Sequence, residues 1–536
     1  MNIHDSIAGI GDGMFQRYLI LACGICFMSD SVEVTMLSFL SFTLDDVWDL
    51  KYWQVASMTS SVFAGMLIGS LFWGALSDLH GRRPIFLISS AVIAVSGTLS
   101  AFAINVYAMM VCRFFVGIGV GGFTIPFDIA AEFLPVATRG RSLLLLDFFW
   151  TAGSLSIPII ASITLPSGSW RIFVFCSAIP SFCAIVMGYL YVPESPLWLV
   201  EVGRLKEADE IIQSAAMMNG KTSDEASALS VRNRQSQKTT EIDEDVKAYN
   251  VPVSFRGAVE NYVVCLGKLT HPSIRNQMMT LCGLWTVFGF SYYGLILATT
   301  RVFKEDEFSY GSIVVACSAE ILGVFLALHV IDNPSWGRVY PQMVFYLAAS
   351  PCALLMCLTL WTVFGFLARM LIFSALCLTW ISTPEILPTD IRGTGHSIAN
   401  ACARIGAFCS PYIVHNMNVS ISTVGVYLAL SCLLASWASS NLKETVGERL
   451  DGEERVEGSS VDNFEKYLKT LSPPGSPQRS KAASPQLFEM GYVDVKREDA
   501  PPINRTMTEP IKGFGKRVDL KGYRPPSFAE SIDPNV

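Results

Sequence analysis

Apolar residues along this chain gather in long blocks that short polar segments separate. A helix needs about 20 apolar residues to cross the roughly 30 Å of hydrocarbon in a bilayer, and these blocks reach that length. A backbone in lipid must satisfy its own hydrogen bonds, and apolar runs this long favour helices over barrel strands. The pattern therefore predicts an all-α integral membrane protein with twelve transmembrane helices. The predicted spans are residues 15–42, 53–75, 84–104, 106–131, 143–165, 170–192, 276–300, 310–331, 341–360, 362–384, 394–416 and 422–441.

Two long polar segments divide the chain into four parts. We expect a six-helix bundle in residues 1–192, a cytoplasmic linker in 193–275, a second six-helix bundle in 276–445 and a disordered cytoplasmic tail in 446–536. The first apolar block is too long for a cleaved signal peptide, so we interpret it as a retained signal anchor.

The linker and the tail differ in their periodicity. Apolar residues recur at helical spacing from Glu201 to Met217 and again from Phe255 to Leu269, which predicts two amphipathic helices. The stretch from Lys221 to Asn250 is polar and is expected to be disordered. The tail is either a passive segment or a regulatory one that proline-directed kinases phosphorylate. Three of its serines precede proline, namely Ser472, Ser476 and Ser484.

Arginine is concentrated in the connections on one side of the predicted bundle. The connections on the other side are acidic, mixed or nearly uncharged. Positive charge stays on the cytoplasmic side of a membrane, so we place the arginine connections and both termini in the cytoplasm. The arginines in question are Arg82, Arg83, Arg139, Arg141, Arg338 and Arg392.

Composition narrows the classes of protein that remain. Charged residues make up only 16% of the chain, against about 25% in soluble proteins. Nothing resembles a basic nucleic-acid face, so nucleic acid is not an expected partner. The cysteines lie almost wholly inside apolar blocks, and the pair Cys23 and Cys26 is interpreted as packing rather than metal or redox chemistry. We find no nucleophile–base pair, metal cluster or nucleotide loop, and expect no enzyme activity and no cofactor.

The chain repeats itself at an offset of 250 to 256 residues. Glu132 to Gly140 and Glu385 to Gly393 both have the pattern Glu-x-x-Pro-x-x-x-Arg-Gly. Three further pairs share the offset, namely Asp78 with Asp332, Arg113 with Arg369, and Glu194 with Glu444. A duplication of six spans explains them all. It predicts two pseudo-symmetric six-helix bundles with a substrate path between them.

Three segments of the chain resemble a known family of membrane transporters. Gly74 to Arg83 resembles the signature loop of the major facilitator superfamily, and Arg113 to Gly122 resembles its fourth helix. Pro193 to Leu199, with the sequence Pro-Glu-Ser-Pro-Leu-Trp-Leu, resembles the motif of the sugar and organic-ion porters. The resemblance covers roughly residues 15–447 and implies a secondary transporter that works by alternating access.

A narrower resemblance points to the synaptic vesicle 2-related proteins. It rests on Ser291 to Thr300, together with Asp30-Ser-Val-Glu33 and Thr383-Pro-Glu385. The synaptic vesicle glycoproteins carry a large lumenal domain after the seventh helix, whereas about ten residues separate the seventh and eighth spans here. The related orphan transporters therefore fit better. Lys443-Glu-Thr-Val-Gly447 also departs from the usual Pro-Glu-Thr-Lys-Gly.

Ionisable residues inside the predicted spans are candidates for ion coupling, because a charge in hydrocarbon is expensive unless it is paired or faces a cavity. Asp30 and Glu33 lie at i and i+3 on one helix face, at a depth similar to that of Arg113. In the proton-coupled sugar porters that this chain resembles, an acid of the first helix pairs with an arginine of the fourth. We hypothesise that Asp30 or Glu33, with Arg113, couples proton or cation movement to solute movement. The alternative is a static ion pair that fixes helix packing.

The charged residues at the cytoplasmic helix ends have a different predicted role. The resemblance implies that they latch the two halves together in the outward-open state. The alternative is that the positive residues set topology alone, although topology requires no glutamate. The predicted latch consists of Asp78, Arg82, Arg83, Glu132, Arg139, Glu194, Asp332, Arg338, Glu385 and Arg392.

Aromatic and acidic residues near the middle of the predicted spans are candidates for a substrate cavity. Such a set suits an organic cation through cation–π contacts, whereas the alternative for any one aromatic is lipid or helix packing. The candidates are Asp147, Trp150, Tyr292, Tyr293, Glu320 and Trp380. Gly117, Gly119, Gly121 and Gly122 lie inside a span and predict close helix contact, not a phosphate loop.

The leading hypothesis is a monomeric secondary transporter of a small organic solute in the plasma membrane or a vesicle membrane. Proton symport is the first mechanism and facilitated diffusion the second. The alternative is a receptor or vesicle protein of transporter shape that acts through partners. Substrate, driving ion and glycosylation of the Asn418 sequon stay open.

Overall fold

A computed structural model describes most of the chain up to residue 444. The described residues are 3–134, 139–229, 267–304, 307–331, 336–387 and 391–444, without the side chains of His4, Ala75, Ser273, Arg392 and Gly393. The chain divides into the units Met1–Arg455 and Val456–Val536. The tail serines, Asp332, most of the stretch from Lys221 to Asn250 and nearly all of the helix predicted from Phe255 to Leu269 lie outside the described residues.

The helices of the first half account for six crossings. The segments α5 and α6 form one crossing, and so do α8 and α9. The bounds are α2 Met14–Trp48, α3 Tyr52–His80, α4 Arg82–Ser100, α5 Val106–Val120, α6 Thr124–Phe133, α7 Arg139–Thr164 with the 3-10 turn η1 Leu165–Ser167, α8 Trp170–Ser177 and α9 Ile179–Tyr191.

Six more helices form the second half. Eleven crossings in the described chain are long and apolar enough to span a bilayer, and α19 is a twelfth helix that packs against α15 and α3. The predicted all-α fold with twelve helices is confirmed. The bounds are α15 Pro272–Val302, α16 Tyr310–Val330, α17 Val339–Thr359, α18 Thr362–Ile386, α19 Arg392–Val414 and α20 Ile421–Ser440.

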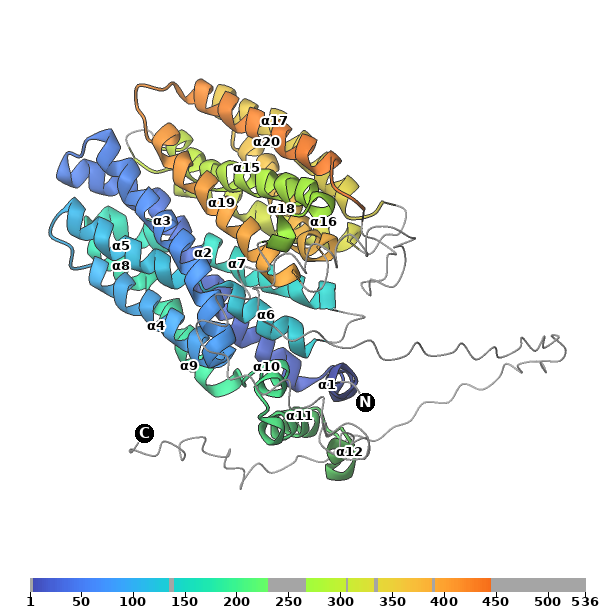
Figure 1. The fold of residues 1–536 in the computed structure, drawn as a ribbon. Coiled ribbons are helices and arrows are strands. Elements are labelled where there is room, and N and C mark those ends of the chain that lie inside the picture. The colour runs from blue at the N-terminus through green and yellow to red at the C-terminus, as the bar shows by residue number, and fades with distance from the viewer. Residues whose placement is uncertain are drawn as a thin grey trace, which may run out of the picture. The chain divides into compact units, whose positions relative to one another are not determined.

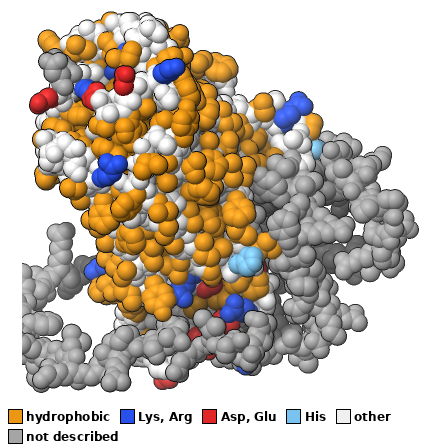
Figure 2. Space-filling model, turned by 90° about the vertical axis from the view of Figure 1, so that its left-hand side faces the viewer, with side chains coloured by type: hydrophobic (Ala, Val, Ile, Leu, Met, Phe, Trp, Pro, Cys, Tyr) orange, Lys and Arg blue, Asp and Glu red, His pale blue; other side chains and the backbone are white. Residues whose placement is uncertain are grey.

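The two halves lie side by side, with the first half in blue to cyan and the second in green to orange (Figure 1). Helix α3 packs on α19, and α7 packs on α16, so these pairs join the halves. Hydrophobic side chains cover the middle of the face in Figure 2, while charged side chains gather toward its two ends. This distribution is that of a protein surrounded by lipid.

Glycines let the helices of the first half approach closely. A methyl group at Gly117 of α5 would collide with the backbone of α3 at Val62. Small residues at helix contacts are a common way to bring membrane helices together. This contact agrees with the interpretation of the glycine run as helix packing.

We name the two ends of the helical unit by their connections. The arginine-rich end carries the connections that follow α3, α6, α16 and α18, and the opposite end carries those that follow α2, α15 and α19. The tight turns after α3 and α16 use Gly81 and Gly337, with φ of 97° and 70°. Residues with a Cβ rarely adopt such φ values, so glycine is required at both turns.

Short helices follow the first half at the arginine-rich end, and they are α10 Pro196–Glu201, α11 Leu205–Met218 and α12 Ser223–Ala228. The single helix predicted from Glu201 to Met217 is wrong at its start, because Gly203 with φ of 80° breaks the backbone before α11. Asn219 at the end of α11 accepts a hydrogen bond from the backbone N–H of Phe15 at 2.9 Å and donates to Gln16 at 2.8 Å. The linker thereby holds the start of α2, beside the N-terminal helix α1 Ile3–Ile10.

Candidate functional site

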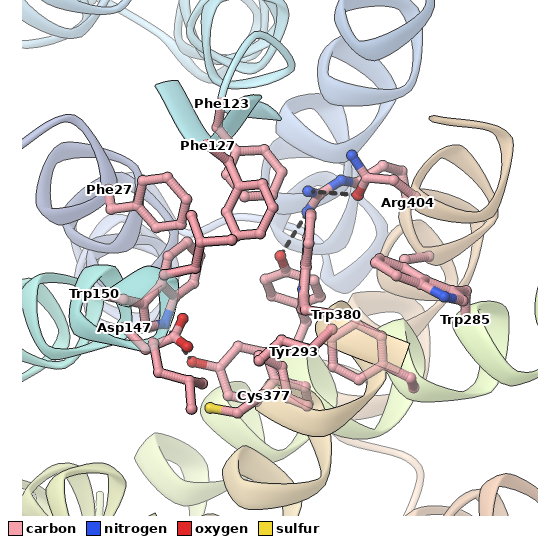
Figure 3. A pocket seen from close by; sticks show the side chains of 18 residues that line it. Phe27, Phe123, Phe127, Asp147, Trp150, Trp285, Tyr293, Cys377, Trp380 and Arg404 are labelled. Atoms are coloured by element: carbon pink, nitrogen blue, oxygen red, sulfur yellow. Dashed lines mark hydrogen bonds between the residues drawn. The ribbon is translucent and has the colours of Figure 1, made fainter. Parts of the chain in front are cut away.

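A pocket lies between the two halves and is mainly aromatic (Figure 3). We call it the central pocket. Helices α2, α6 and α7 line it from the first half, and α15, α18 and α19 line it from the second. Its aromatic residues are Phe27, Phe123, Phe127, Trp150, Trp285, Phe288, Tyr292, Tyr293 and Trp380, and its polar ones include Asp147, Cys377, Asn400 and Arg404.

Five of the six residues predicted for the cavity line this pocket, namely Asp147, Trp150, Tyr292, Tyr293 and Trp380. Glu320 does not line it, because Glu320 is fully buried and holds the hydroxyl of Tyr292. Among the described residues that line the central pocket, Asp147 is the one acid, and its partner in the pocket wall is Cys377.

Two polar residues of α19 line the pocket without having been predicted for it. Arg404 donates to Tyr293 Oη at 2.5 Å and to Asn400 Oδ1 at 3.0 Å. Its guanidinium carbon also lies 5.2 Å from the ring centroid of Phe123. The signal that could have identified Arg404 is an arginine inside an apolar block, which is costly without a function.

The first half contains a buried ion pair between α2 and α5. Arg113 Nη1 lies 2.6 Å from Glu33 Oε2, and both side chains are at most 1% exposed. Arg113 also donates to the hydroxyl of Ser100 at the end of α4. All three partners belong to the first half, so the pair holds the helices of one bundle together.

The second half contains a buried ion pair that reaches across to the first. Arg369 Nε lies 2.9 Å from Glu320 Oε1, and Arg369 Nη2 donates to Ser154 Oγ of α7 at 2.7 Å. Tyr292 Oη donates to Glu320 at 3.0 Å and accepts from Trp150 Nε1 of α7 at 2.7 Å. This network therefore ties the second half to α7 at two points.

Asp30 is fully buried on α2, one helical turn before Glu33. Neither of its carboxylate oxygens accepts a hydrogen bond within the described part of the chain. Arg113 holds Glu33 and not Asp30, although either acid was a candidate partner for it. A buried carboxylate without a partner is costly and is a feature expected of a functional site.

Contacts between the halves close the opposite end of the molecule. Lys304 Nζ lies 2.8 Å from Asp46 Oδ2, and Phe39 of α2 packs on Phe308, with 5.1 Å between ring centroids. Ser57 of α3 lies 3.1 Å from the hydroxyl of Tyr412 of α19. These contacts join the two halves at that end of the molecule.

The arginine-rich end carries the residues of the predicted latch. Arg82 pairs with Glu132 at 2.5 Å, and Arg338 pairs with Glu385. Each of these pairs joins elements of a single half. Latching of one half to the other stays a prediction.

Two carboxylates cap helices in equivalent positions of the halves. Glu194 accepts from the backbone N–H groups of Arg82 and Arg83 at the start of α4. Glu444 accepts from those of Arg338 and Val339 at the start of α17, at 2.7 and 3.0 Å. A carboxylate at a helix N-terminus satisfies unpaired donors and complements the helix dipole. Among the described residues, Glu194 therefore binds backbone N–H groups and no guanidinium. Glu444 is its equivalent in the second half, and the predicted latch did not include it.

The remaining predicted latch residues have varied surroundings. Arg83 donates to the carbonyl of Tyr189 at 2.9 Å, and Arg139 donates to that of Leu134 at 3.4 Å. The carbonyl of Asp78 accepts from Trp198 of α10 at 2.8 Å. Asp332 and the side chain of Arg392 lie outside the described residues. Nearby, burial raises the pKa of Glu201 on α10, while the charge of Arg82 acts in the opposite direction.

Two six-helix halves around an internal pocket define a transporter of the major facilitator superfamily. The model of the family described as sugar (and other) transporter matches residues 20–456. The chain therefore belongs to this family of multi-pass membrane transporters.

Individual relatives agree with that assignment. The synaptic vesicle 2-related protein of Bos taurus is 30% identical over 482 residues, which cover 84% of this chain and 82% of the relative. The organic cation/carnitine transporter 7 of Arabidopsis thaliana is 29% identical over 465 residues, which cover 79% of this chain and 90% of the relative. The xylose transporter XylE from E. coli, in a partially occluded inward open conformation, superposes with a TM-score of 0.60 at 17% identity, covering 79% of this chain and 98% of XylE.

Proposed function

We propose that this protein moves a small organic solute across the membrane by alternating access, with protons as the coupling ion. The observation that carries the proposal is the central pocket, which both halves line and which contacts between the halves close off at the opposite end. Opening that end requires those contacts to break. Closing the arginine-rich end requires the two halves to approach each other there.

The chemistry of the pocket supports a charged organic solute over a sugar. Nine aromatic side chains line the pocket, with Asp147 from the first half and Arg404 from the second. Aromatic faces bind flat or cationic groups, and the two charged groups bind opposite charges. A relative named for organic cation and carnitine transport agrees with this chemistry.

Uptake into proteoliposomes tests the proposal. The panel contains sugars, organic cations and organic anions, each with and without a pH gradient. We expect accumulation of an organic ion that a pH gradient increases. Equilibration without accumulation would indicate facilitated diffusion, and no uptake of any solute would contradict transport.

A cross-link at the opposite end tests alternating access directly. Asp46→Cys and Lys304→Cys together place two thiols where an ion pair now joins the halves. We expect oxidation to block uptake and a reductant to restore it, because the opposite end is then held closed. Each single cysteine variant is the control. Unchanged uptake by the fully cross-linked protein would overturn the proposal.

The latch at the arginine-rich end is a second conformational element of the proposal. Removing the guanidinium of Arg82 leaves Glu132 without its cation. We expect Arg82→Ala to favour the state that is open at the arginine-rich end. Labelling of reporter cysteines at both ends measures this shift, and unaltered labelling at both ends would refute the latch.

A further inference from the structure

A histidine at the opposite end is buried with both ring nitrogens unpartnered. His415 follows Val414, the last residue of α19, and its side chain is 3% exposed. Neither Nδ1 nor Nε2 has a hydrogen-bond partner in the described part of the chain. A neutral imidazole carries one N–H donor and one acceptor nitrogen. Burying both without a partner costs free energy, so this position calls for an explanation beyond packing.

The imidazole lies at a contact between the two halves. It packs against the ring of Phe42 of α2, with 5.1 Å between the ring centroids. Phe42 is 6% exposed, and Lys304 Nζ lies 5.3 Å from the centroid of the same ring. Lys304 also pairs with Asp46 of α2. Two residues of the second half therefore hold one aromatic side chain of the first half.

Cations lie close to this contact and disfavour a further positive charge within it. Arg301 of α15 donates to the carbonyl oxygens of Val414 and Val419, at 2.6 and 2.9 Å, in the connection that contains the imidazole. The charge of Arg301 acts on His415. The carbonyl end of a helix usually attracts a cation, but at α19 Arg301 already binds the carbonyl of Val414. A protonated His415 would therefore be a buried cation near Arg301 and Lys304.

The other titratable groups at this end make no ion pair with His415 within the described part of the chain. Asp46 is 63% exposed and is paired with Lys304. The hydroxyl of Tyr412, on the last turn of α19, lies 3.1 Å from Ser57 of α3. The remaining groups are Asp45 and Asp49 at the end of α2 and Lys51 at the start of α3, while Glu305 and Asp306 lie outside the described residues.

We propose that His415 is a pH-sensitive element of the contact between the halves: when its imidazole takes up a proton, the contact with Phe42 breaks and the molecule opens at the opposite end. The inference rests on the proposed alternating access and assigns it a regulatory residue at one end of the molecule. It involves neither the central pocket nor the two buried ion pairs. The predicted topology places this end outside the cytoplasm, so acid on that side favours the state that receives solute from it.

The direction follows from the surroundings of the imidazole in the two states. While the halves are in contact, a proton on His415 is buried without an acceptor and near Arg301, so this state disfavours protonation. Once the halves separate at this end, water reaches the ring, and an exposed imidazole takes up a proton below about pH 6.5. The open state therefore binds the proton more tightly, and acid shifts the balance toward it. The contact is fully stable above about pH 6.5 and weakens as pH falls.

Labelling of a buried reporter thiol in the purified full-length protein measures the opening. Ser38 of α2 lies one helical turn before Phe42, is 1% exposed and accepts a hydrogen bond from Thr300 of α15 at 2.9 Å. A cysteine introduced by Ser38→Cys is therefore shielded until the halves separate. Thiol reactivity itself changes with pH, so each rate is divided by that of Met417→Cys, at a position of the same end that is 69% exposed. Protein without a reporter gives the background from native cysteines.

Acid should raise this labelling ratio. We expect the rise to begin near pH 6.5 and to reach up to about tenfold per pH unit below it. His415→Gln and His415→Asn are neutral at every pH, and each should flatten the response. His329→Gln, at an exposed histidine of α16 at the arginine-rich end, is the matched control and should respond as the wild type does.

Three outcomes would overturn the role of His415. A labelling ratio that does not change with pH would show that no titrating group controls this end. A response that begins only below about pH 5 would indicate a carboxylate. A response that both amide variants retain would exclude His415. The first two outcomes are measured with the native histidine, so they decide even where a variant does not fold.

Failure of this inference differs from failure of the proposed function. If labelling of the Ser38→Cys reporter does not respond to pH while proteoliposomes accumulate a solute, the role of His415 is wrong and the proposed transport stands. If no solute in the panel is transported, the proposed function itself fails.

Discussion

Each half of the molecule buries an arginine in its fourth span, and the two arginines hold different parts together. Arg113 and Arg369 lie 256 residues apart, as expected for a duplicated unit. Arg113 takes its acid, Glu33, from the first span of its own half, whereas the acid of Arg369, Glu320, comes from the second span of its half. Arg369 also contacts Ser154 of the other half.

This difference shows how a duplicated fold acquires an asymmetric function. A pair that lies within one bundle stabilises that bundle in every conformation. A network that crosses from one bundle to the other stabilises only those conformations in which the two bundles keep the relative position that its contacts require. The first pair therefore acts on folding, and the second acts on the balance between conformations as well.

The largest expected effect comes from removing either arginine. Arg113→Gln and Arg369→Gln each leave a buried carboxylate without its cation, which should lower the free energy of unfolding by roughly 3–5 kcal/mol. Thermal unfolding in detergent measures the loss. Adding Glu33→Gln to the first variant, and Glu320→Gln to the second, should restore most of the stability, because no unpaired charge then remains.

The same double variants sharpen the comparison. A reporter cysteine is placed at Ser57, which contacts Tyr412 at the opposite end. Of the two double variants, only Arg369→Gln with Glu320→Gln should alter labelling of this cysteine. Equal changes in labelling for both double variants would show that the two ion pairs have the same effect on the balance between conformations.

A smaller effect is expected from two matched serines. Ser100 accepts a hydrogen bond from Arg113 within the first half, and Ser154 accepts one from Arg369 across the halves. A hydrogen bond to a charged group contributes about 1.5–3 kcal/mol. Ser100→Ala should lower thermal stability by this amount without changing reporter labelling. Ser154→Ala should increase labelling at the opposite end by roughly tenfold or more, and a purely thermal effect of Ser154→Ala would contradict its role between the halves.

The smallest effect is expected at the surface of the opposite end. Asp46 is 63% exposed in its pair with Lys304. Exposed ion pairs contribute about 0–1 kcal/mol and weaken with salt. Asp46→Asn should therefore change reporter labelling at Ser57 only slightly, and less at high ionic strength than at low. A large, salt-independent change would place the main contact between the halves here rather than at Arg369.

Much of the architecture could be predicted from the chain alone. The twelve spans follow from block length, because hydrocarbon thickness sets the length of a helix. The repeat of Glu132 to Gly140 at Glu385 to Gly393 predicts two related halves. Most of the predicted cavity residues, including Trp150 and Trp380, line the central pocket, because mid-span polar and aromatic residues favour the interior.

Other features depend on side-chain contacts that cannot be predicted from the spacing of residues along the sequence. Glu320 was expected in the cavity, yet it lies behind Tyr292. Glu194 was expected in the latch between the halves, yet its carboxylate caps the start of α4. Glu194 lies in the connection between α9 and α10, and the path of that connection brings its carboxylate to the start of α4. Glu320 lies on α16, and the rotation of that helix about its axis decides which neighbours its side chain meets. That rotation is set by packing against neighbouring helices and not by the helix's own sequence.

The sequence by itself determined that this chain crosses a membrane twelve times in two similar halves and that acids and arginines lie inside the spans. Hydrocarbon thickness sets the length of each apolar block, and duplication repeats motifs at a fixed offset, so both are visible in the sequence itself. Only the tertiary structure decided which acid meets which arginine, that Asp30 and Arg404 have no ion-pair partner in the described chain, and that one ion-pair network crosses the halves. Those features depend on distances between segments that lie hundreds of residues apart, which helix packing alone sets.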